Sequence, residues 1–285
     1  MEKLNKANNL KRPNLLMNSD YESGIINQQG INKYTNTTTS SKLIIDGWLM
    51  NGQSKMFVVV NENNLIFDTT AATEEYHSIY QRVEGDFKEN KDYIVRVYVD
   101  NKYYDYCFNF NKSDSFISET YDGKFRFNIN WNSSYNSLAF RFSVVKGKKI
   151  TLYRMKLEEG KIFTGMPVWN PILEELKCNK SLYVVDLQNS KVVSNMNATL
   201  LSAEIPIPSS MRKIPSIAGI TFPLTFNLRK DGNDYSGLQA TGINSVILKK
   251  NKVLVTFSLK TNTLITRSIY VFVDDIKFYL DSYDY

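Results

Sequence analysis

The sequence contains very few of the residues that carry metal or nucleophilic chemistry. Among 285 residues there are 2 cysteines and 1 histidine. Cys107 and Cys178 fall in different predicted domains, so they are read as two free thiols and no disulfide framework follows. His77 lies in a polar segment, without the cysteine or histidine partners that a zinc site needs, and is expected at the surface. These absences argue against a disulfide-stapled scaffold and a zinc enzyme.

Long apolar runs and catalytic motifs are also missing. No stretch approaches the roughly 18 apolar residues of a membrane span, and the polar, basic N-terminus has no secretory core. We therefore expect synthesis in a cytoplasm without export by a signal peptide. The chain has no nucleophile elbow, phosphate-binding glycine loop or Cys–His arrangement. An enzyme is not expected, although sequence alone does not show how carboxylates are spaced for glycoside hydrolysis.

Positive charge is present but is not clustered. The formal net charge is +6, and the densest basic group is Lys146-Gly147-Lys148-Lys149, which is typical of a hairpin turn. Nucleic-acid affinity needs a contiguous set of phosphate contacts. The scattered lysines and arginines therefore predict a solvated surface and no nucleic-acid partner.

Aromatic residues are abundant, with 18 tyrosines and 16 phenylalanines, and they follow a strand-like pattern. Apolar and polar residues alternate in Tyr93–Val99, in Phe125–Trp131 and in Leu138–Val144, and Asp100-Asn101 and Asp122-Gly123 supply turns. A period of two with regular turn signals predicts antiparallel strands. Strands arriving every 8–15 residues or so indicate an all-β sandwich.

The length favours two domains, because single cores usually stop growing near 250 residues. We predict a flexible lead-in over residues 1–12, a β-domain over 13–166, a linker over 167–179 and a second β-sandwich domain over 180–285. The linker carries the one credible helix. Asn170 can cap it, Pro171 suits its first position, and Glu174-Glu175 suits the positive end of the helix dipole.

Two groups of residues near the ends of the first domain carry a resemblance. Pro13–Tyr21 opens the domain and Lys156–Gly160 closes it, followed by Trp169–Cys178 and Tyr183. With shorter islands between and beyond them, they resemble the carbohydrate-binding-like jelly-roll modules of bacteriophage tail fibres and receptor-binding proteins, also found in phage-tail-like bacteriocins. The islands lie at Ile26–Gly30, Ile45–Trp48, Tyr80–Glu84, Lys91–Tyr93, Ile205–Pro208 and Met211–Pro215.

This resemblance implies an N-terminal jelly roll, a second β-domain, and often a homotrimer at a fibre tip. It also implies a location in the virion tail or a tail-like particle, contact with other tail proteins, and release of the particle by lysis. The implied partner is a bacterial cell-surface polysaccharide or teichoic-acid-like glycan. Related sequences usually carry a basic residue where Gly47 stands and an arginine where Gln29 stands, so any ligand role at those positions is in doubt here.

Saccharide recognition uses aromatic rings that stack on sugar faces and polar groups that bond to hydroxyls. The candidates are aromatic residues that periodicity does not assign to the core, and polar residues on a strand that could line the concave sheet. These are Tyr103, Tyr104, Tyr106, Tyr135, Trp131, Gln81 and Arg82. For each, an ordinary structural role competes with ligand contact; Trp131 in particular shares the face of Phe125 and Phe127.

Carboxylates near the two ends of the first domain form a second candidate group. The terminal strands of a jelly roll often lie next to each other, so Asp20 and Glu22 could meet Glu158. Converging carboxylates suit a structural Ca²⁺, which takes 6–8 oxygen ligands. No other cofactor is expected.

The function expected from these observations is reversible, lectin-like recognition of a cell-surface glycan by a tail receptor-binding protein. A structural tail or baseplate adaptor without glycan affinity is the main alternative. A polysaccharide depolymerase is a weaker one, because the long β-helical repeats that are common in such enzymes are not seen.

Overall fold

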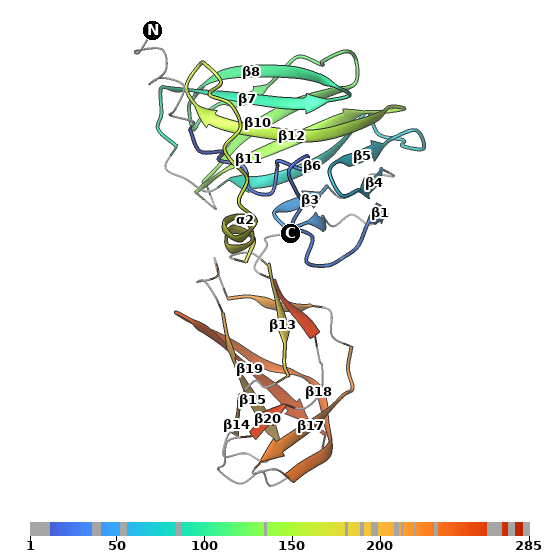
Figure 1. Cartoon of the computed structure of the whole chain (residues 1–285), viewed down its shortest axis with the longest axis vertical. Coiled ribbons are helices and arrows are strands. Elements are labelled where there is room, and N and C mark those ends of the chain that lie inside the picture. The colour runs from blue at the N-terminus through green and yellow to red at the C-terminus, as the bar shows by residue number, and fades with distance from the viewer. Residues whose placement is uncertain are drawn as a thin grey trace. The chain divides into compact units, whose positions relative to one another are not determined.

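The structure is a computed structural model. It describes residues 12–35, 41–51, 56–83, 87–133, 136–179, 182–188, 191–194, 199–207, 211, 214–218, 221–230, 233–260, 270–272 and 277–281. The chain divides into two compact units, with the division between Glu175 and Leu176 (Figure 1). That position lies within the segment predicted to be a linker.

The first unit contains two six-stranded antiparallel sheets (Figure 1). Sheet A has the order β1 (Lys33–Thr35), β4 (Phe57–Val60), β5 (Leu65–Asp68), β12 (Lys149–Glu159), β7 (Lys91–Val99), β8 (Lys102–Phe110). Sheet B has the order β2 (Lys42–Ile45), β3 (Trp48–Met50), β6 (Tyr76–Val83), β11 (Ser137–Val145), β10 (Phe125–Asn132), β9 (Ser115–Ile117). The predicted all-β sandwich is confirmed.

Strands from the first half of the domain pair with the last two strands of the domain. β12 pairs with β5, and β11 pairs with β6, as in the wrapped hairpin of a jelly roll. β12 then pairs with β7 on its other side. β7 pairs with its chain neighbour β8 through a two-residue turn, in which Asp100 and Asn101 both have positive φ, 47° and 65°. That geometry matches the predicted Asp-Asn turn.

The core of this unit lies between the two sheets and is rich in aromatic rings. Phe125, Phe127 and Ile129 of β10 are fully buried, and Phe140 and Phe142 of β11 lie beside them. Trp48 is also fully buried and meets the Phe140 ring edge-on at 6.1 Å. The residues between these face outward, so the period of two decides which side chains reach solvent.

The second unit is also all-β. A three-stranded sheet has the order β13 (Leu182–Asp186), β21 (Lys277–Asp281), β16 (Ser216–Ala218). Six more strands close into a barrel: β14 (Lys191–Ser194), β15 (Leu200–Pro206), β19 (Lys252–Leu259), β18 (Asn233–Lys249), β17 (Leu224–Lys230), β20 (Tyr270–Phe272). The larger sheet therefore closes on itself, where a second sandwich was predicted.

The length of β18 explains this closure. Its first half pairs with β17 and its second half pairs with β19. Register shifts between Ala240 and Gly242, and between Ile243 and Ser245, separate the two halves. Such bulges bend and twist a strand, so one strand turns the corner that closes the sheet.

The predicted helix is present as α2 (Pro171–Cys178). Its cap is Asn170, whose Oδ1 accepts a hydrogen bond from the Leu173 backbone N–H at 3.2 Å. Glu174 lies in the first turn, as expected from the helix dipole. Among the described residues, no helix has the length and apolar character that crossing a membrane requires.

Candidate functional site

The N-terminal segment completes an edge of sheet A. β12 pairs with β5 only as far as Leu152, where the register shifts, so one edge of its later residues is left without a strand partner. Residues 14–22 supply the missing backbone partners. The hydrogen bonds run from Glu22 N to Tyr153 O (2.9 Å), from Met155 N to Ser19 O (2.7 Å) and from Leu15 N to Leu157 O (2.8 Å). The opening and closing motifs of the domain therefore lie side by side.

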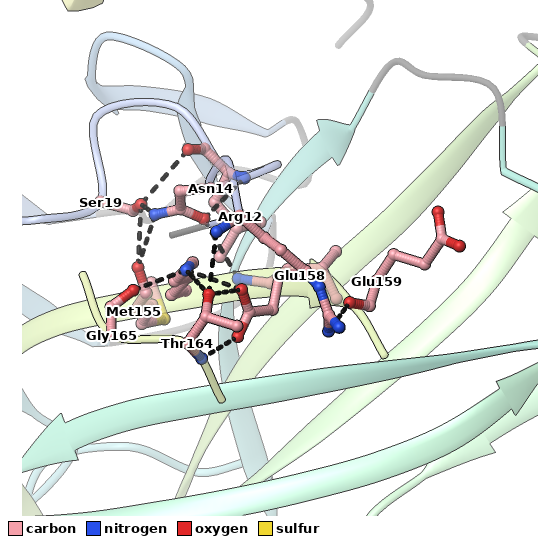
Figure 2. A network of polar contacts seen from close by, with 11 residues as sticks. Arg12, Asn14, Ser19, Met155, Glu158, Glu159, Thr164 and Gly165 are labelled. Atoms are coloured by element: carbon pink, nitrogen blue, oxygen red, sulfur yellow. Dashed lines mark hydrogen bonds and ion pairs between the residues drawn. The ribbon is translucent and has the colours of Figure 1, made fainter. Parts of the chain in front are cut away.

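Asn14 fastens this contact through its side chain (Figure 2). Its Nδ2 donates to Ser19 Oγ at 2.9 Å and to Met155 O at 3.0 Å. Its Oδ1 accepts from the backbone N–H groups of Leu16 and Leu157, both at 3.1 Å. One amide thus serves four partners on two segments that lie far apart in the sequence, which gives this asparagine a structural role.

A buried ion pair lies on the same strand (Figure 2). Lys156 Nζ is 2.7 Å from Glu158 Oε2, and both side chains are fully buried. Thr164 donates to the two Glu158 oxygens, from its N–H at 2.7 Å and from its hydroxyl at 2.6 Å, while Lys156 donates to Gly165 O at 2.6 Å. The chain after β12 therefore folds back over the outer face of sheet A. The charges of Lys156 and Glu158 are both satisfied by partners within the protein.

The three carboxylates considered for calcium already have cationic partners in the chain. Arg154 lies between Asp20 and Glu22, with its Nε 3.4 Å from Asp20 Oδ1 and its Nη2 paired with Glu22 Oε2. Glu158 is paired with Lys156. In the part of the chain that is described, no three histidine, cysteine or acidic side chains form a group suited to a metal ion.

Three tyrosines gather on the outer face of sheet A, beyond the fold-back. Tyr98 of β7 and Tyr103 of β8 are cross-strand partners, and their rings stack at 4.5 Å between centroids. Tyr153 lies at the register shift of β12 and approaches Tyr98 at 5.0 Å. A bulge re-aims the side chain at that position, which explains why Tyr153 joins the other two. Tyr98, Tyr103 and Tyr153 are called the tyrosine cluster below.

The tyrosine cluster is exposed and has polar groups beside it. Tyr103 is 57% exposed, a high value for a ring of that size. Its neighbour Arg96 donates two hydrogen bonds to Asp105, at 2.6 and 2.5 Å, and its guanidinium lies 5.7 Å from the Tyr103 ring. Tyr98 donates to Asn101 Oδ1 at 3.4 Å. An aromatic surface bordered by a guanidinium, a carboxylate and an amide is chemically suited to a sugar ring and its hydroxyls.

Of the three proposed tyrosines that the structure describes, Tyr103 belongs to this cluster and the other two do not. The pleat of β8 places Tyr104 and Tyr106 on the opposite face, where both pack against the core. Tyr104 also donates to Asp122 Oδ2 at 2.5 Å, and partial burial together with that carboxylate raises the pKa of Tyr104 to about 12. Tyr98 and Arg96 were not predicted from the sequence, although the alternation in Tyr93–Val99 assigns both to one face.

Gln81 and Arg82 also separate onto opposite faces, of sheet B. Gln81 is buried, accepts from Met17 N at 2.9 Å, and donates to Met17 O at 3.1 Å and Gly47 O at 2.9 Å. A Cβ at Gly47, whose φ is 89°, would stand 2.7 Å from the Met17 side chain. The glycine found in place of a basic residue therefore fits this packing. Arg82 lies half-buried on the outer face.

Trp131 is a half-buried residue at the border of the core. Its ring meets those of Phe110 at 5.7 Å and Phe87 at 6.3 Å, and Lys112 Nζ lies 5.0 Å from its centroid. Tyr135 falls outside the described residues.

The expectation that His77 lies at the surface is wrong, because its side chain is 1% exposed and Nε2 contacts Glu74 O at 2.8 Å. Strand pairing of β6 carries it inward, which a polar local sequence does not reveal.

A cavity of about 410 Å³ lies where the N-terminal segment meets the end of β12. Its lining is mostly apolar and consists of Arg12, Pro13, Leu15, Phe87, Tyr93, Glu159 and Gly160. Arg12 Nη1 donates to Glu159 O, so one wall is held by the same N-terminal contact. Among the described residues that line this cavity, Glu159 supplies the one carboxylate.

Comparison with protein-family models gave no match, and comparison with curated protein sequences gave none either. What the chain does is therefore inferred from the geometry described above, together with the resemblance seen in the sequence.

Proposed function

We propose that the protein is a receptor-binding protein of a phage tail or tail-like particle, and that it recognises a bacterial cell-surface glycan at the tyrosine cluster. The observation that supports this most is the exposed stack of Tyr98 and Tyr103 beside the Arg96–Asp105 pair. Binding is non-covalent. The ring of Tyr103 stacks on the apolar face of a sugar, and the neighbouring polar groups bond to its hydroxyls.

The cluster is suited to binding because its side chains are already held in place. Tyr98 is fixed between two rings and a hydrogen bond to Asn101, and Arg96 is fixed by two bonds to Asp105. Ordering a free side chain costs about 0.5–1.5 kcal/mol on binding. A surface that is preorganised in the free protein avoids much of that cost.

Each such site is small, so its affinity for a glycan is modest. In the proposed assembly, a homotrimer at a fibre tip with other tail proteins behind it, three copies act together and gain avidity through effective concentration. The protein is made in the bacterial cytoplasm and leaves by lysis as part of the particle.

The test is binding of the fluorescently labelled chain to a panel of bacterial cells and their purified wall polysaccharides, with free sugars as competitors. We expect saturable, sugar-competed binding without shortening of the polysaccharide. Tyr103→Ala should weaken it about tenfold, equivalent to about 1.4 kcal/mol. Tyr103→Phe keeps the ring and serves as the matched control, with nearly unchanged affinity.

Other outcomes select other functions. No saturable binding to any cell or polysaccharide, from chain shown to be folded, contradicts the proposal and favours the structural adaptor. New reducing ends on incubation with the polysaccharide favour a depolymerase. Equal affinity of Tyr103→Ala and the unchanged chain places the site elsewhere.

A further inference from the structure

The outer face of sheet B carries a regular array of side chains that the tyrosine cluster does not use. The register of β6, β11 and β10 aligns outward-facing residues in three rows across the strands. The rows are Ser78–Ser143–Arg126, Tyr80–Arg141–Asn128 and Arg82–Ala139–Asn130. None of these nine positions holds a carboxylate, whereas three hold an arginine.

Two of the arginines are stacked on tyrosines. The Arg126 guanidinium lies 3.5 Å from the Tyr76 ring centroid, and that of Arg141 lies 5.7 Å from the Tyr80 ring centroid. Neither forms an ion pair with an acidic side chain among the described residues, and each Nε–H is buried without a hydrogen-bond acceptor there. Stacking fixes the plane of a guanidinium while leaving its edge available for an oxyanion.

The two arginines are close enough on the sheet for one polymer chain to contact both. Arg126 and Arg141 occupy diagonal positions on neighbouring strands, since Arg126 faces Ser143 and Arg141 faces Asn128. Diagonal positions of this kind lie about 7–8 Å apart along the sheet. Each guanidinium is positively charged and lacks an acidic partner among the described residues, so each attracts a negatively charged group of such a polymer.

We propose that this face is a second binding surface, and that it takes an acidic polysaccharide through carboxylate or phosphodiester groups held by Arg126 and Arg141. Beside this pair the face carries the half-buried amides of Asn128 and Asn130, which suit sugar hydroxyls, while the buried hydroxyls of Ser78 and Ser143 bond to each other at 2.9 Å. A single-stranded nucleic acid would instead need open aromatic faces for its bases. Here the guanidiniums already lie over the faces of Tyr76 and Tyr80.

This inference rests on the proposed function in one respect, that the partner is a polysaccharide, but it uses no residue of the tyrosine cluster. The probes are polygalacturonate for carboxylates, poly(glycerol phosphate) for phosphodiesters, neutral dextran, and single-stranded DNA. We expect at least one acidic polymer to bind the unchanged chain, to weaken steeply as salt rises, and to exceed dextran and DNA in affinity. The acidic polymer that binds more tightly identifies the oxyanion.

The decisive variant is Arg126→Gln/Arg141→Gln. Charge-assisted hydrogen bonds are among the stronger ones, so we expect a loss of about tenfold or more in affinity for the acidic polymer. Lys249→Gln/Lys260→Gln removes the same charge at exposed positions of the second unit and should change the affinity by less than about twofold. Arg126→Lys/Arg141→Lys keeps the charge without the planar fork and should fall between the two.

The outcomes separate this inference from the proposed function. Tyr103→Ala should leave the salt dependence of binding to these acidic probes unchanged. If neither acidic polymer binds, if both double-glutamine variants lose affinity equally, or if DNA binds as tightly as the better acidic polymer, the second surface is wrong. A folded Arg126→Gln/Arg141→Gln variant that keeps full affinity contradicts it as well, and none of these results depends on whether the tyrosine cluster binds sugar.

Discussion

The two outer faces of the first unit differ in whether their charged side chains are paired with side chains of opposite charge. On sheet A, charged groups come in partnered sets: Arg96 with Asp105, Arg154 with Asp20 and Glu22, and Lys156 with Glu158. On sheet B, Arg126 and Arg141 rest on tyrosine rings, and no carboxylate among the described residues pairs with them. Both faces have the same strand lattice, so the difference comes from the residues placed on it.

The comparison indicates that charge on sheet A mainly holds structure, while charge on sheet B is left available. The N-terminal segment and the chain after β12 cover part of sheet A and use its ion pairs as fastenings. Its remaining open surface is aromatic, so the glycan binding proposed there would depend on stacking. Sheet B offers guanidiniums, so the binding proposed there would depend on ionic interaction and on salt.

The largest expected effect comes from breaking the buried pair on sheet A. Glu158→Ala leaves Lys156 charged and fully buried without its carboxylate, which typically costs about 3–5 kcal/mol. The double variant Lys156→Met/Glu158→Leu removes both charges and should cost much less. All three tryptophans, Trp48, Trp131 and Trp169, lie in the first unit, so their fluorescence during urea unfolding measures its stability. Equal losses in the two variants would show that the cost does not come from leaving a buried charge without its partner.

A buried acid at the end of sheet B provides a second test, through pH. Asp46, in the turn between β2 and β3, is fully buried, and its Oδ1 has no hydrogen-bond partner among the described residues. Burial raises the pKa of Asp46 from 3.8 to about 7, and the nearby Glu175 contributes in the same direction. The folded protein therefore holds a proton that the unfolded chain releases near pH 4.

Such a group favours folding below pH 4, and its contribution is lost as pH rises towards 7. Each pKa unit is worth about 1.4 kcal/mol, so a pKa raised from 3.8 to about 7 gives an upper limit of about 4 kcal/mol. Unfolding free energies measured at pH 4 and pH 7 should therefore differ more for the unchanged chain than for Asp46→Asn, which does not titrate. The same pH dependence in both would contradict this assignment.

An intermediate effect is expected from the side chain that fastens the N-terminal segment. Asn14→Ala removes four hydrogen bonds, among them the Oδ1 acceptor of the Leu157 N–H and one of the donors to Met155 O. A loss of about 2 kcal/mol in the unfolding free energy is expected. Asn61→Ala is the matched control, because the exposed Asn61 side chain donates to Asn64 and has no other hydrogen-bond partner within the described segments of the chain. Its loss should stay within about 0.5 kcal/mol. If the two variants lose equally, the segment is not held through Asn14.

The smallest effects are expected from two variants that give each face the charge pattern of the other. These variants test the comparison of the two faces most closely. Asn128→Asp places a carboxylate directly opposite Arg141, as Asp105 lies opposite Arg96 on sheet A. It should stabilise the fold by about 0.2–1 kcal/mol and should weaken binding of acidic polymers. Asp105→Asn should destabilise by a similar amount. An Asn128→Asp variant that still binds acidic polymers at full strength would break the comparison.

The fold was largely accessible from the sequence, because alternation and turn residues are local signals. Phe125–Trp131 and Asp100-Asn101 specify a strand and a tight turn by themselves, and both predictions are confirmed. Closure of the second unit into a barrel was not predicted, since it depends on two register shifts within β18 that leave no clear local mark.

The candidate site was only partly accessible. Tyr103 could be singled out as a tyrosine beside a turn, but Tyr153 joins it through a bulge and a pairing between strands that are distant in the sequence. Gln81 is a polar residue of the kind that binds sugar hydroxyls. Its side chain nevertheless faces inward and accepts a hydrogen bond from the Met17 backbone N–H. Which face a polar residue occupies depends on the register of its strand, and register is set by distant pairing.

The most direct test of the difference between the two faces is the salt dependence of affinity for one acidic wall polysaccharide that the unchanged chain binds, measured by titration calorimetry. The proteins compared are the unchanged chain, Tyr103→Ala and Arg126→Gln/Arg141→Gln. Because such a polymer can engage both faces, we predict that Tyr103→Ala binds more weakly but keeps the full salt dependence, while the arginine variant loses most of it. Equal salt dependence in all three proteins would contradict the claim that one face binds by stacking and the other by charge.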